Sequence, residues 1–105
     1  IKNFRYANGR NRSISKVAVC GGSCSEYLEE AINSGADAFV TADVKYHAFQ
    51  EAEDRILFID AGHYETEIPS LEEVQKRLRN FLKNESKIKV FKYSGSTNPV
   101  IFYNN

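Results

Sequence analysis

The sequence predicts a layered α/β domain with a mostly parallel sheet flanked by helices. Short apolar runs alternate along the chain with segments in which apolar residues recur at helical spacing. Because the connections between successive runs are long enough to hold a helix, they favour parallel strands and right-handed crossovers. The chain has 105 residues, of which 42% are hydrophobic, so we expect one small domain with a modest core.

The first predicted strand covers residues 16–20, a short apolar run that ends at Gly21-Gly22. Such a run is typical of a buried strand that enters a tight glycine loop. Ser23 and Glu26 have the spacing of a capping box, and the apolar residues that follow share one helical face as far as Gly35. We therefore expect a strand, a glycine loop and a helix in this order.

The same order recurs in the middle of the chain. Residues 38–41 form the second predicted strand and residues 46–53 the next helix, with Asp43 as a candidate N-cap. Residues 56–59 are four apolar residues without alternation, which is the pattern of a strand covered on both faces. A third strand is expected there.

The last part of the chain predicts one more helix and one more strand. Ser70 and Glu73 form a second capping box, and apolar residues at helical spacing extend the predicted helix over residues 70–83. A strand is expected over residues 88–93, and a turn-rich stretch then precedes a short apolar tail at residues 100–103.

Charge is balanced overall but unevenly distributed. The 14 basic and 14 acidic residues cancel, so no global field attracts nucleic acid or an anionic membrane. Residues 1–25 hold five basic residues and no acid, whereas residues 26–105 hold nine basic and fourteen acidic residues, a net charge of −5. We expect the basic lead-in, residues 1–15, to be a solvated loop with a turn at Asn8-Gly9; a contact with phosphate is the alternative.

The sequence lacks the features of a membrane or secreted protein. It has no apolar run near the roughly 18 residues that a membrane span needs, and its first residues have no signal-peptide core. We expect a soluble, cytoplasmic protein with no direct binding to nucleic acid. Because the chain begins with Ile1, we also expect it to be a piece of a longer protein.

The only cysteines are Cys20 and Cys24. Two cysteines are too few for a zinc ribbon without histidines at suitable spacing, and the sequence cannot show whether a base that would activate a nucleophile lies nearby. We expect both to be free, partly buried thiols in a reducing compartment.

Three polar segments follow the predicted strands. They are Cys20–Ser23, Thr41–His47 and Asp60–Glu67. Ligands of open parallel sheets bind outside the carboxyl ends of the strands, so these segments are expected to meet at one edge. The first could present amide groups to an anion, but a plain turn is the simpler interpretation.

His63 and Glu67 are the strongest candidate ligands. Four residues apart on a helical segment, they would lie on one face and offer one nitrogen and one oxygen to zinc, iron or manganese. An ordinary surface pair is the alternative. Two ligands hold a metal poorly, so a second chain or a further segment would have to complete the site. Glu65 is expected to face solvent.

Four segments of the chain together resemble a known family. Val17–Ser23, Gly35–His47, Asp60–Glu67 and Asn98-Pro99 are similar to the C-terminal part of the Nif-three-like dinuclear metal-centre family, whose members are often labelled GTP cyclohydrolase I type 2 homologues. The resemblance extends over about residues 15 to 100. Cys24 and Ala42 depart from it, because the family commonly has glycine at both positions.

The resemblance implies a fold of two related halves with two divalent metal ions between them. His63 and Glu67 fall on the family's C-terminal ligands, and the carboxylate of Glu67 could bridge both ions. An adjacent histidine pair and an aspartate would come from the N-terminal half, which this chain lacks. Asp43 and His47 match an Asp-x-x-x-His element beside the cleft and are expected to contact substrate or support the ligands.

The expected function follows from this resemblance. The complete protein would be a metal-dependent hydrolase acting on a nucleotide-like small molecule, assembled as a homo-oligomer such as a hexamer. The isolated chain is expected to be inactive without the N-terminal half. The alternatives are a regulatory or protein-interaction module with structural metals, and an α/β domain without metal.

Overall fold

A computed structural model of the chain describes residues 3–10 and 13–103. The chain divides into two compact units, Ile1–Ile68 and Pro69–Asn105.

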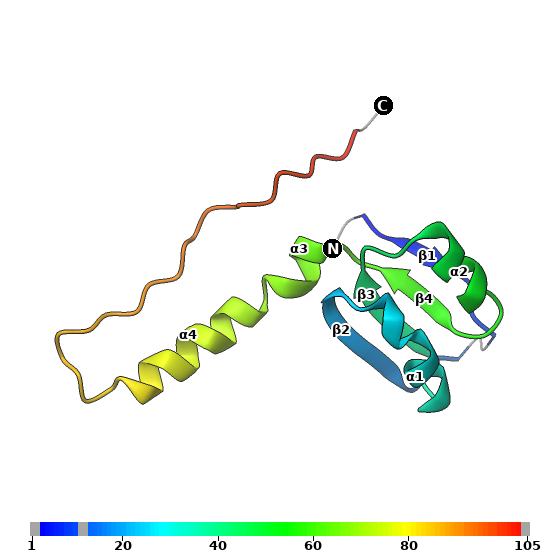
Figure 1. Ribbon diagram of the computed structural model, residues 1–105. Coiled ribbons are helices and arrows are strands. Elements are labelled where there is room, and N and C mark those ends of the chain that lie inside the picture. The colour runs from blue at the N-terminus through cyan, green and yellow to red at the C-terminus, as the bar shows by residue number, and fades with distance from the viewer. Residues whose placement is uncertain (1–2, 11–12, 104–105) are drawn as a thin grey trace. The chain divides into compact units, whose positions relative to one another are not determined.

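The first unit contains a four-stranded sheet (Figure 1). Three strands, β2 (Val17–Ser23), β3 (Ala38–Ala42) and β4 (Leu57–Asp60), are parallel neighbours. The fourth, β1 (Arg5–Ala7), runs antiparallel to β4, which gives the order β1-β4-β3-β2. The predicted mostly parallel sheet is therefore confirmed, and so are the predicted strands at 38–41 and 56–59.

Helices connect the parallel strands and continue after the last one. A 3-10 turn, η1 (Ser25–Tyr27), leads into α1 (Leu28–Asn33), and α2 (Tyr46–Ala52) connects β3 to β4. The short α3 (His63–Glu67) follows β4 directly. The prediction of a helix over residues 46–53 is confirmed to within one residue.

Aromatic packing joins the sheet to α1 and α2 in one core. The rings of Phe39 in β3 and Phe58 in β4 stack with centroids 5.5 Å apart, and Phe49 of α2 lies 5.6 Å from Phe58. Leu28 and Ala31 of α1 belong to the same buried cluster. Since Phe39 and Phe58 are register partners, both helices cover the same face of the sheet.

The opposite face of the sheet is less covered. Val17 and Val19 of β2 are 50% and 70% exposed, and in β4 half-buried Leu57 and Ile59 alternate with buried Phe58 and Asp60. In the described part of the chain, one face of this third strand is therefore fully covered, as predicted, and the other face is covered only in part. The apolar residues at 56–59 favour a β-strand by their intrinsic propensity, so their presence does not by itself indicate that both faces are buried.

Part of the basic lead-in is a strand, which the sequence analysis missed. Arg5–Ala7 pairs with β4 in the register Tyr6↔Ile59, so these residues are not a solvated loop. Just beyond, a Cβ atom at Gly9 would overlap the backbone of Leu57, and only glycine lets the chain pass this closely. Lys2 and Arg12 of the lead-in lie outside the described residues.

The predicted glycine loop is also part of a strand. β2 does not end at Cys20 but continues through Gly21-Gly22 to Ser23, and its register against β3 shifts between Val19 and Ser23. Cys20 and Cys24 form a disulfide across this irregular segment, with Cα atoms 6.0 Å apart. The prediction of free thiols is therefore wrong, because it rested on cellular context and not on the distance that this backbone sets.

The three predicted helix caps are wrong. The starts of η1, α2 and α4 have no side-chain cap hydrogen bond in the described structure. Ser23 belongs to β2, and Ser70 follows Pro69, whose backbone is already helical. The N-cap of α2 is Lys45, while Asp43 has a φ of 55° and turns its carboxylate towards α3.

The second unit contains one long helix and an extended segment. Helix α4 (Ser70–Phe81) agrees with the predicted helix over 70–83, whereas the strand predicted at 88–93 is absent from the described residues. Arg79 Nη2 and Gln75 Nε2 both donate to the Val90 carbonyl, so side chains of α4 hold this part of the segment. Nowhere in residues 3–10 and 13–103 does a helix have the length and apolar character needed to cross a membrane.

Candidate metal half-site

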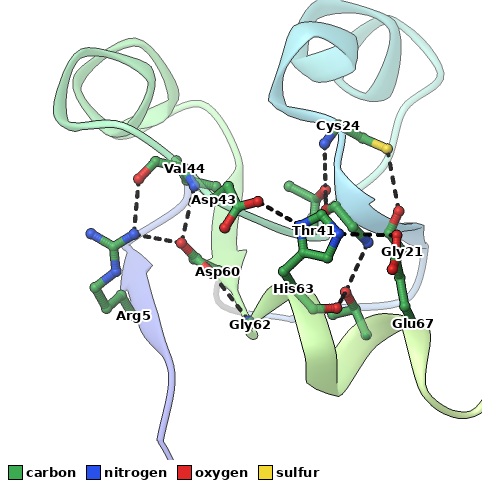
Figure 2. Close-up of polar contacts among 12 residues, drawn as sticks. Arg5, Gly21, Cys24, Thr41, Asp43, Val44, Asp60, Gly62, His63 and Glu67 are labelled. Carbon is green, nitrogen blue, oxygen red and sulfur yellow. Dashed lines mark hydrogen bonds and ion pairs between the residues drawn. The ribbon is translucent and has the colours of Figure 1, made fainter. Parts of the chain in front are cut away.

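The short helix α3 carries the two predicted ligands at the carboxyl end of β4. Its N-cap is Gly62, with a φ of 95°, a left-handed conformation that favours glycine. Only two residues, Ala61 and Gly62, connect the end of β4 to the start of α3. His63, the first residue of α3, is thereby brought beside Asp43, which follows β3 (Figure 2).

The imidazole of His63 lies between two carboxylates. Its Nδ1 atom is 2.6 Å from Oδ2 of Asp43, and its Nε2 atom is 3.2 Å from Oε1 of Glu67. The three side chains, here called the His63 cluster, are each about half exposed: 49% for His63, 54% for Asp43 and 55% for Glu67. Figure 2 shows the ring between its two partners, so one loop, which carries Asp43, and one helix, which carries His63 and Glu67, form the cluster.

The two carboxylates change the protonation of His63. The hydrogen bond with Asp43, followed by the charge of Glu67, raises the pKa of the imidazole above its ordinary value, against a smaller opposing effect of burial. In the metal-free chain the ring therefore keeps its second proton to a higher pH than a free histidine does. The proton on Nε2 occupies the position that a metal ion would need.

The backbone of β2 lies directly under the cluster. A Cβ atom at Gly22, whose φ is 76°, would overlap Oε1 of Glu67 and lie 3.4 Å from Nε2 of His63. At Gly21 a Cβ atom would come within 2.9 Å of the Thr66 carbonyl oxygen. Gly21 is thus required for α3 to pack this closely on the end of β2, whereas a side chain at Gly22 would displace the Glu67 carboxylate.

Two threonines tie these elements together, and the sequence analysis missed both. Thr66 Oγ1 accepts a hydrogen bond from the Gly22 amide at 2.9 Å. Thr41, which is fully buried, donates to the Gly22 carbonyl at 2.9 Å and accepts from the Cys24 amide at 3.1 Å. The sequence places Thr41 at a strand end and Thr66 in a helix, but only the tertiary structure brings both hydroxyls to Gly22.

Asp60 was also missed as an organiser of the site. The residue is 7% exposed, and its Oδ2 accepts from the Val44 amide at 3.0 Å and from Arg5 Nη2 at 2.5 Å. Its Oδ1 accepts from the Gly62 amide at 3.1 Å. Burial by itself raises the pKa of Asp60, but these hydrogen bonds, first from Val44 and then from Arg5 and Gly62, bring it below its ordinary value.

The contacts of Asp60 fix both sides of the cluster at once. Val44 directly follows Asp43, and Gly62 directly precedes His63, so one buried carboxylate holds the two backbone segments that deliver these side chains (Figure 2). Arg5 Nη2 completes the arrangement by donating to the Val44 carbonyl at 2.9 Å. The lead-in strand therefore contributes to the site although none of its residues belongs to the cluster.

The donor set fits half of a metal site. Two donors bound to one tetrahedral ion at about 2.0–2.2 Å lie roughly 3.3–3.5 Å apart, close to the 3.2 Å between His63 Nε2 and Glu67 Oε1. Asp43 holds the other ring nitrogen, as carboxylates that orient metal-binding histidines do. Among the described residues no group of three or more His, Cys, Asp or Glu side chains could hold a metal ion.

Two other residues discussed in the sequence analysis, His47 and Glu65, do not belong to the His63 cluster. His47 is exposed on α2, where its Nδ1 lies 3.2 Å from Gln50 Oε1 and its ring packs edge-on against Tyr46. Glu65 does not face solvent as predicted. It is half-buried, and its carboxylate lies so close to Gly62 that a Cβ there would overlap it, because the third residue of a helix turns back towards the N-cap.

The chain matches the profile of one protein family over almost its whole length. Residues 1–99 match Duf34/NIF3 (NGG1p interacting factor 3). A "GTP cyclohydrolase 1 type 2 homolog" of Nostoc is 46% identical over 68 residues, covering 64% of this chain and 26% of the relative. The protein of the same name from Streptococcus pneumoniae is 34% identical over 90 residues, covering 84% of this chain and 34% of the relative.

Solved structures agree with these sequence matches. Staphylococcus aureus protein SA1388 superposes with a TM-score of 0.86 at 31% identity, over 98% of this chain and 34% of that one. A Bacillus cereus protein related to NIF3 gives a TM-score of 0.85 at 28% identity, over 98% and 29%. The chain thus spans about a third or less of the length of these relatives.

Proposed function

Because this chain belongs to the Duf34/NIF3 family, we propose that His63 and Glu67 are two ligands of a divalent-metal centre whose other ligands come from the rest of the protein. The complete centre serves the hydrolysis of a nucleotide-like substrate. The observation that carries the proposal is the convergence of His63 Nε2 and Glu67 Oε1 at 3.2 Å, with Asp43 on the other ring nitrogen.

Each residue of the His63 cluster has a defined task in this proposal. Asp43 accepts the Nδ1 proton, which fixes the tautomer that leaves the Nε2 lone pair for the metal. Glu67 supplies a carboxylate that can bind one ion or bridge two. A bound ion of this kind acts as a Lewis acid and makes water a better nucleophile near neutral pH.

Surrounding residues hold the two donor atoms, His63 Nε2 and Glu67 Oε1, close together. Gly22 leaves room for the carboxylate of Glu67, and the hydrogen bond between the Gly22 amide and Thr66 holds α3 against β2. Asp60 holds the backbone on either side of Asp43 and His63. A site built this way is preorganised before its remaining ligands arrive, which lowers the entropic cost of binding the ion.

The substrate class rests on the relatives. Proteins similar to this chain carry the name GTP cyclohydrolase 1 type 2 homolog, which points to a purine nucleotide. Since this chain covers about a third of their length, hydrolysis is a property proposed for the complete protein, with its N-terminal half and in a homo-oligomer such as a hexamer.

The test compares metal binding and hydrolysis in variants of the complete protein. His63→Ala and Glu67→Ala should each weaken Zn²⁺ or Mn²⁺ affinity, measured by calorimetry, by more than about 100-fold. They should also abolish metal-dependent product release from a panel of nucleotides. Glu73→Ala is the matched control, because Glu73 is also 55% exposed and also forms an i,i+4 pair, with Arg77. Unchanged metal content and activity in both site variants would refute the proposal.

A second candidate is a protein-interaction module in which the metals are structural. Helix α4 supports it, since its apolar side chains Leu71, Val74, Leu78 and Phe81 are 40%, 50%, 44% and 83% exposed. The same variants separate the two functions. A protein whose Tm rises with metal but which hydrolyses nothing in the panel would favour the structural role.

A further inference from the structure

The segment beneath the His63 cluster is enclosed by the disulfide between Cys20 and Cys24. Cys20 belongs to β2 and Cys24 is the N-cap of η1, so the bond spans Gly21-Gly22-Ser23, here called the glycine segment. The register shift between β2 and β3 falls in this same stretch. The disulfide therefore constrains the part of the strand that departs from regular pairing.

The glycine segment is also the part of β2 that meets the two candidate ligands. Gly22 lies against the Glu67 carboxylate and the His63 ring with no space for a Cβ atom. Its amide donates to Thr66 and its carbonyl accepts from Thr41, each at 2.9 Å. A change in the backbone of this segment would reach Glu67 and His63 without passing through any other element.

Cys24 is linked to the same hydrogen bonds. Its amide donates to Thr41 Oγ1 at 3.1 Å, the hydroxyl that in turn donates to the Gly22 carbonyl (Figure 2). Opening the disulfide frees the Cys24 end of the segment, so this pair of bonds loses its covalent constraint. The first group affected is the carbonyl of Gly22, the residue whose amide donates to Thr66.

The two cysteines lie where a small thiol could approach the protein surface. Both cysteines are partly exposed, and Cys20 contributes to an open surface hollow of about 320 Å³ that is also lined by Ala18, Tyr27 and Phe39. A low-molecular-weight thiol of the glutathione class is small enough to approach through such a hollow. Thiol–disulfide exchange requires this access, because the attacking thiolate must come into line with the S–S bond.

We propose that Cys20 and Cys24 form a reversible thiol–disulfide switch that sets the order of the glycine segment under the His63 cluster. In the reducing direction two small thiols, RSH, convert the protein disulfide into two cysteine thiols and leave as RSSR. The protein gains two electrons and two protons, and a mixed disulfide is the intermediate. The oxidised form holds Gly22 against Glu67 and Thr66, and the reduced form loosens it.

The switch requires both Cys20 and Cys24, which are the only two cysteines of the sequence. It concerns the backbone under the proposed metal ligands, but it does not require that a metal binds there. Its first test therefore uses the metal-free chain, so a failure of the metal proposal and a failure of the switch give different results.

The experiment is amide hydrogen exchange by NMR on the 105-residue chain, before and after reduction with excess dithiothreitol. Exchange at the Gly22 and Cys24 amides should accelerate on the order of tenfold on reduction, while the amides of Phe39 and Phe58 stay protected. The imidazole signals of His63 should shift in the same samples. Oxidised glutathione should restore the first state, and alkylation with iodoacetamide should label both cysteines only after reduction.

Cys24→Ser is the matched variant, since it removes the disulfide and keeps a small polar side chain at the N-cap. Its amide exchange should resemble that of the reduced chain and should not change on addition of dithiothreitol. Unchanged exchange at Gly22 on reduction would overturn the proposal, as would cysteines that glutathione disulfide cannot pair. If protection at Phe39 and Phe58 fell together with that at Gly22, the disulfide would stabilise the whole unit and the local switch would be refuted.

Discussion

The Nδ1 atom of His63 lies 2.6 Å from Oδ2 of Asp43, twenty residues earlier in the chain. This contact joins the carboxyl end of β3 to the start of α3. It both orients the ring and raises the pKa of the imidazole. The orientation favours binding of a metal through Nε2, whereas the raised pKa makes a proton a stronger competitor for the same atom.

Asp43→Asn should lower the pKa of His63, because the carboxylate is the largest single cause of its upward shift. The pair stabilises the fold when His63 is protonated, so its contribution is complete below the unfolded pKa of about 6.5 and is lost as pH rises through the higher folded pKa. NMR titration of the ring protons measures this shift. The ring of His47 contacts Gln50 and not Asp43, so at a fixed pH its NMR signals should be the same in both proteins.

The affinity for metal should increase with pH, whereas the stabilisation by the pair of Asp43 and protonated His63 decreases with pH. A ligand histidine must be neutral, so Zn²⁺ affinity of the complete protein should fall as pH drops through the raised pKa of His63. Calorimetry in buffers of different ionisation enthalpy should detect a proton released on binding below that pKa. Affinity that stays constant from pH 8 down to about pH 6 would contradict a ligand role for His63.

Asp60→Ala should destabilise the first unit by about 2–4 kcal/mol, because the backbone amides of Val44 and Gly62 and the guanidinium of Arg5 lose a buried partner. Chemical denaturation measures the loss. Asp37→Ala is a useful comparison, since that carboxylate bonds Ser15 and Lys16 at an exposed position, and it should cost less.

The lowered pKa of Asp60 also predicts how the stability of the fold changes at acidic pH. Because the folded pKa lies below the unfolded value of about 3.9, the stabilisation is present above that value and is lost as pH falls through the folded pKa. The wild-type chain should therefore lose stability more steeply than Asp60→Asn between about pH 4 and pH 2. Equal slopes would show that Asp60 is not the group that couples folding to acid.

Gly22→Ala and Gly35→Ala separate backbone strain from steric conflict. Both glycines have positive φ, 76° and 82°, so each alanine should cost about 1–2 kcal/mol. At Gly35 nothing lies within 4 Å, but at Gly22 the new Cβ overlaps the Glu67 carboxylate. Glu67 can rotate away, so the additional effect should be a loss of metal affinity in the complete protein and not a larger loss of stability.

Phe58→Ala should cost about 3–5 kcal/mol in the free energy of unfolding, since the ring is fully buried and packs on Phe39 and Phe49. Phe81→Ala is the control, because that ring is 83% exposed on α4 and its loss should change stability by less than about 0.5 kcal/mol. Urea denaturation followed by circular dichroism compares the two. Similar losses in both variants would mean that the core identified around Phe58 is not the stabilising one.

The sequence by itself determined the type and order of the principal elements. Apolar runs at 38–41 and 56–59 and helical spacing at 46–53 and 70–83 are local properties of the chain, so they predicted β3, β4, α2 and α4 to within a few residues. The pairing of His63 with Glu67 was also predictable, because residues four apart meet on any helix.

Only the tertiary structure decided which distant residues meet. The strand Arg5–Ala7 gains its partners from β4, and the disulfide between Cys20 and Cys24 depends on where the strand irregularity places two Cα atoms. Asp60 and Thr41 become organisers of the site because buried polar groups must find hydrogen-bond partners, and those partners come from other segments. The segment 88–93 has strand-like composition but no strand beside it in the described residues, and a strand forms only when a neighbour supplies its hydrogen bonds.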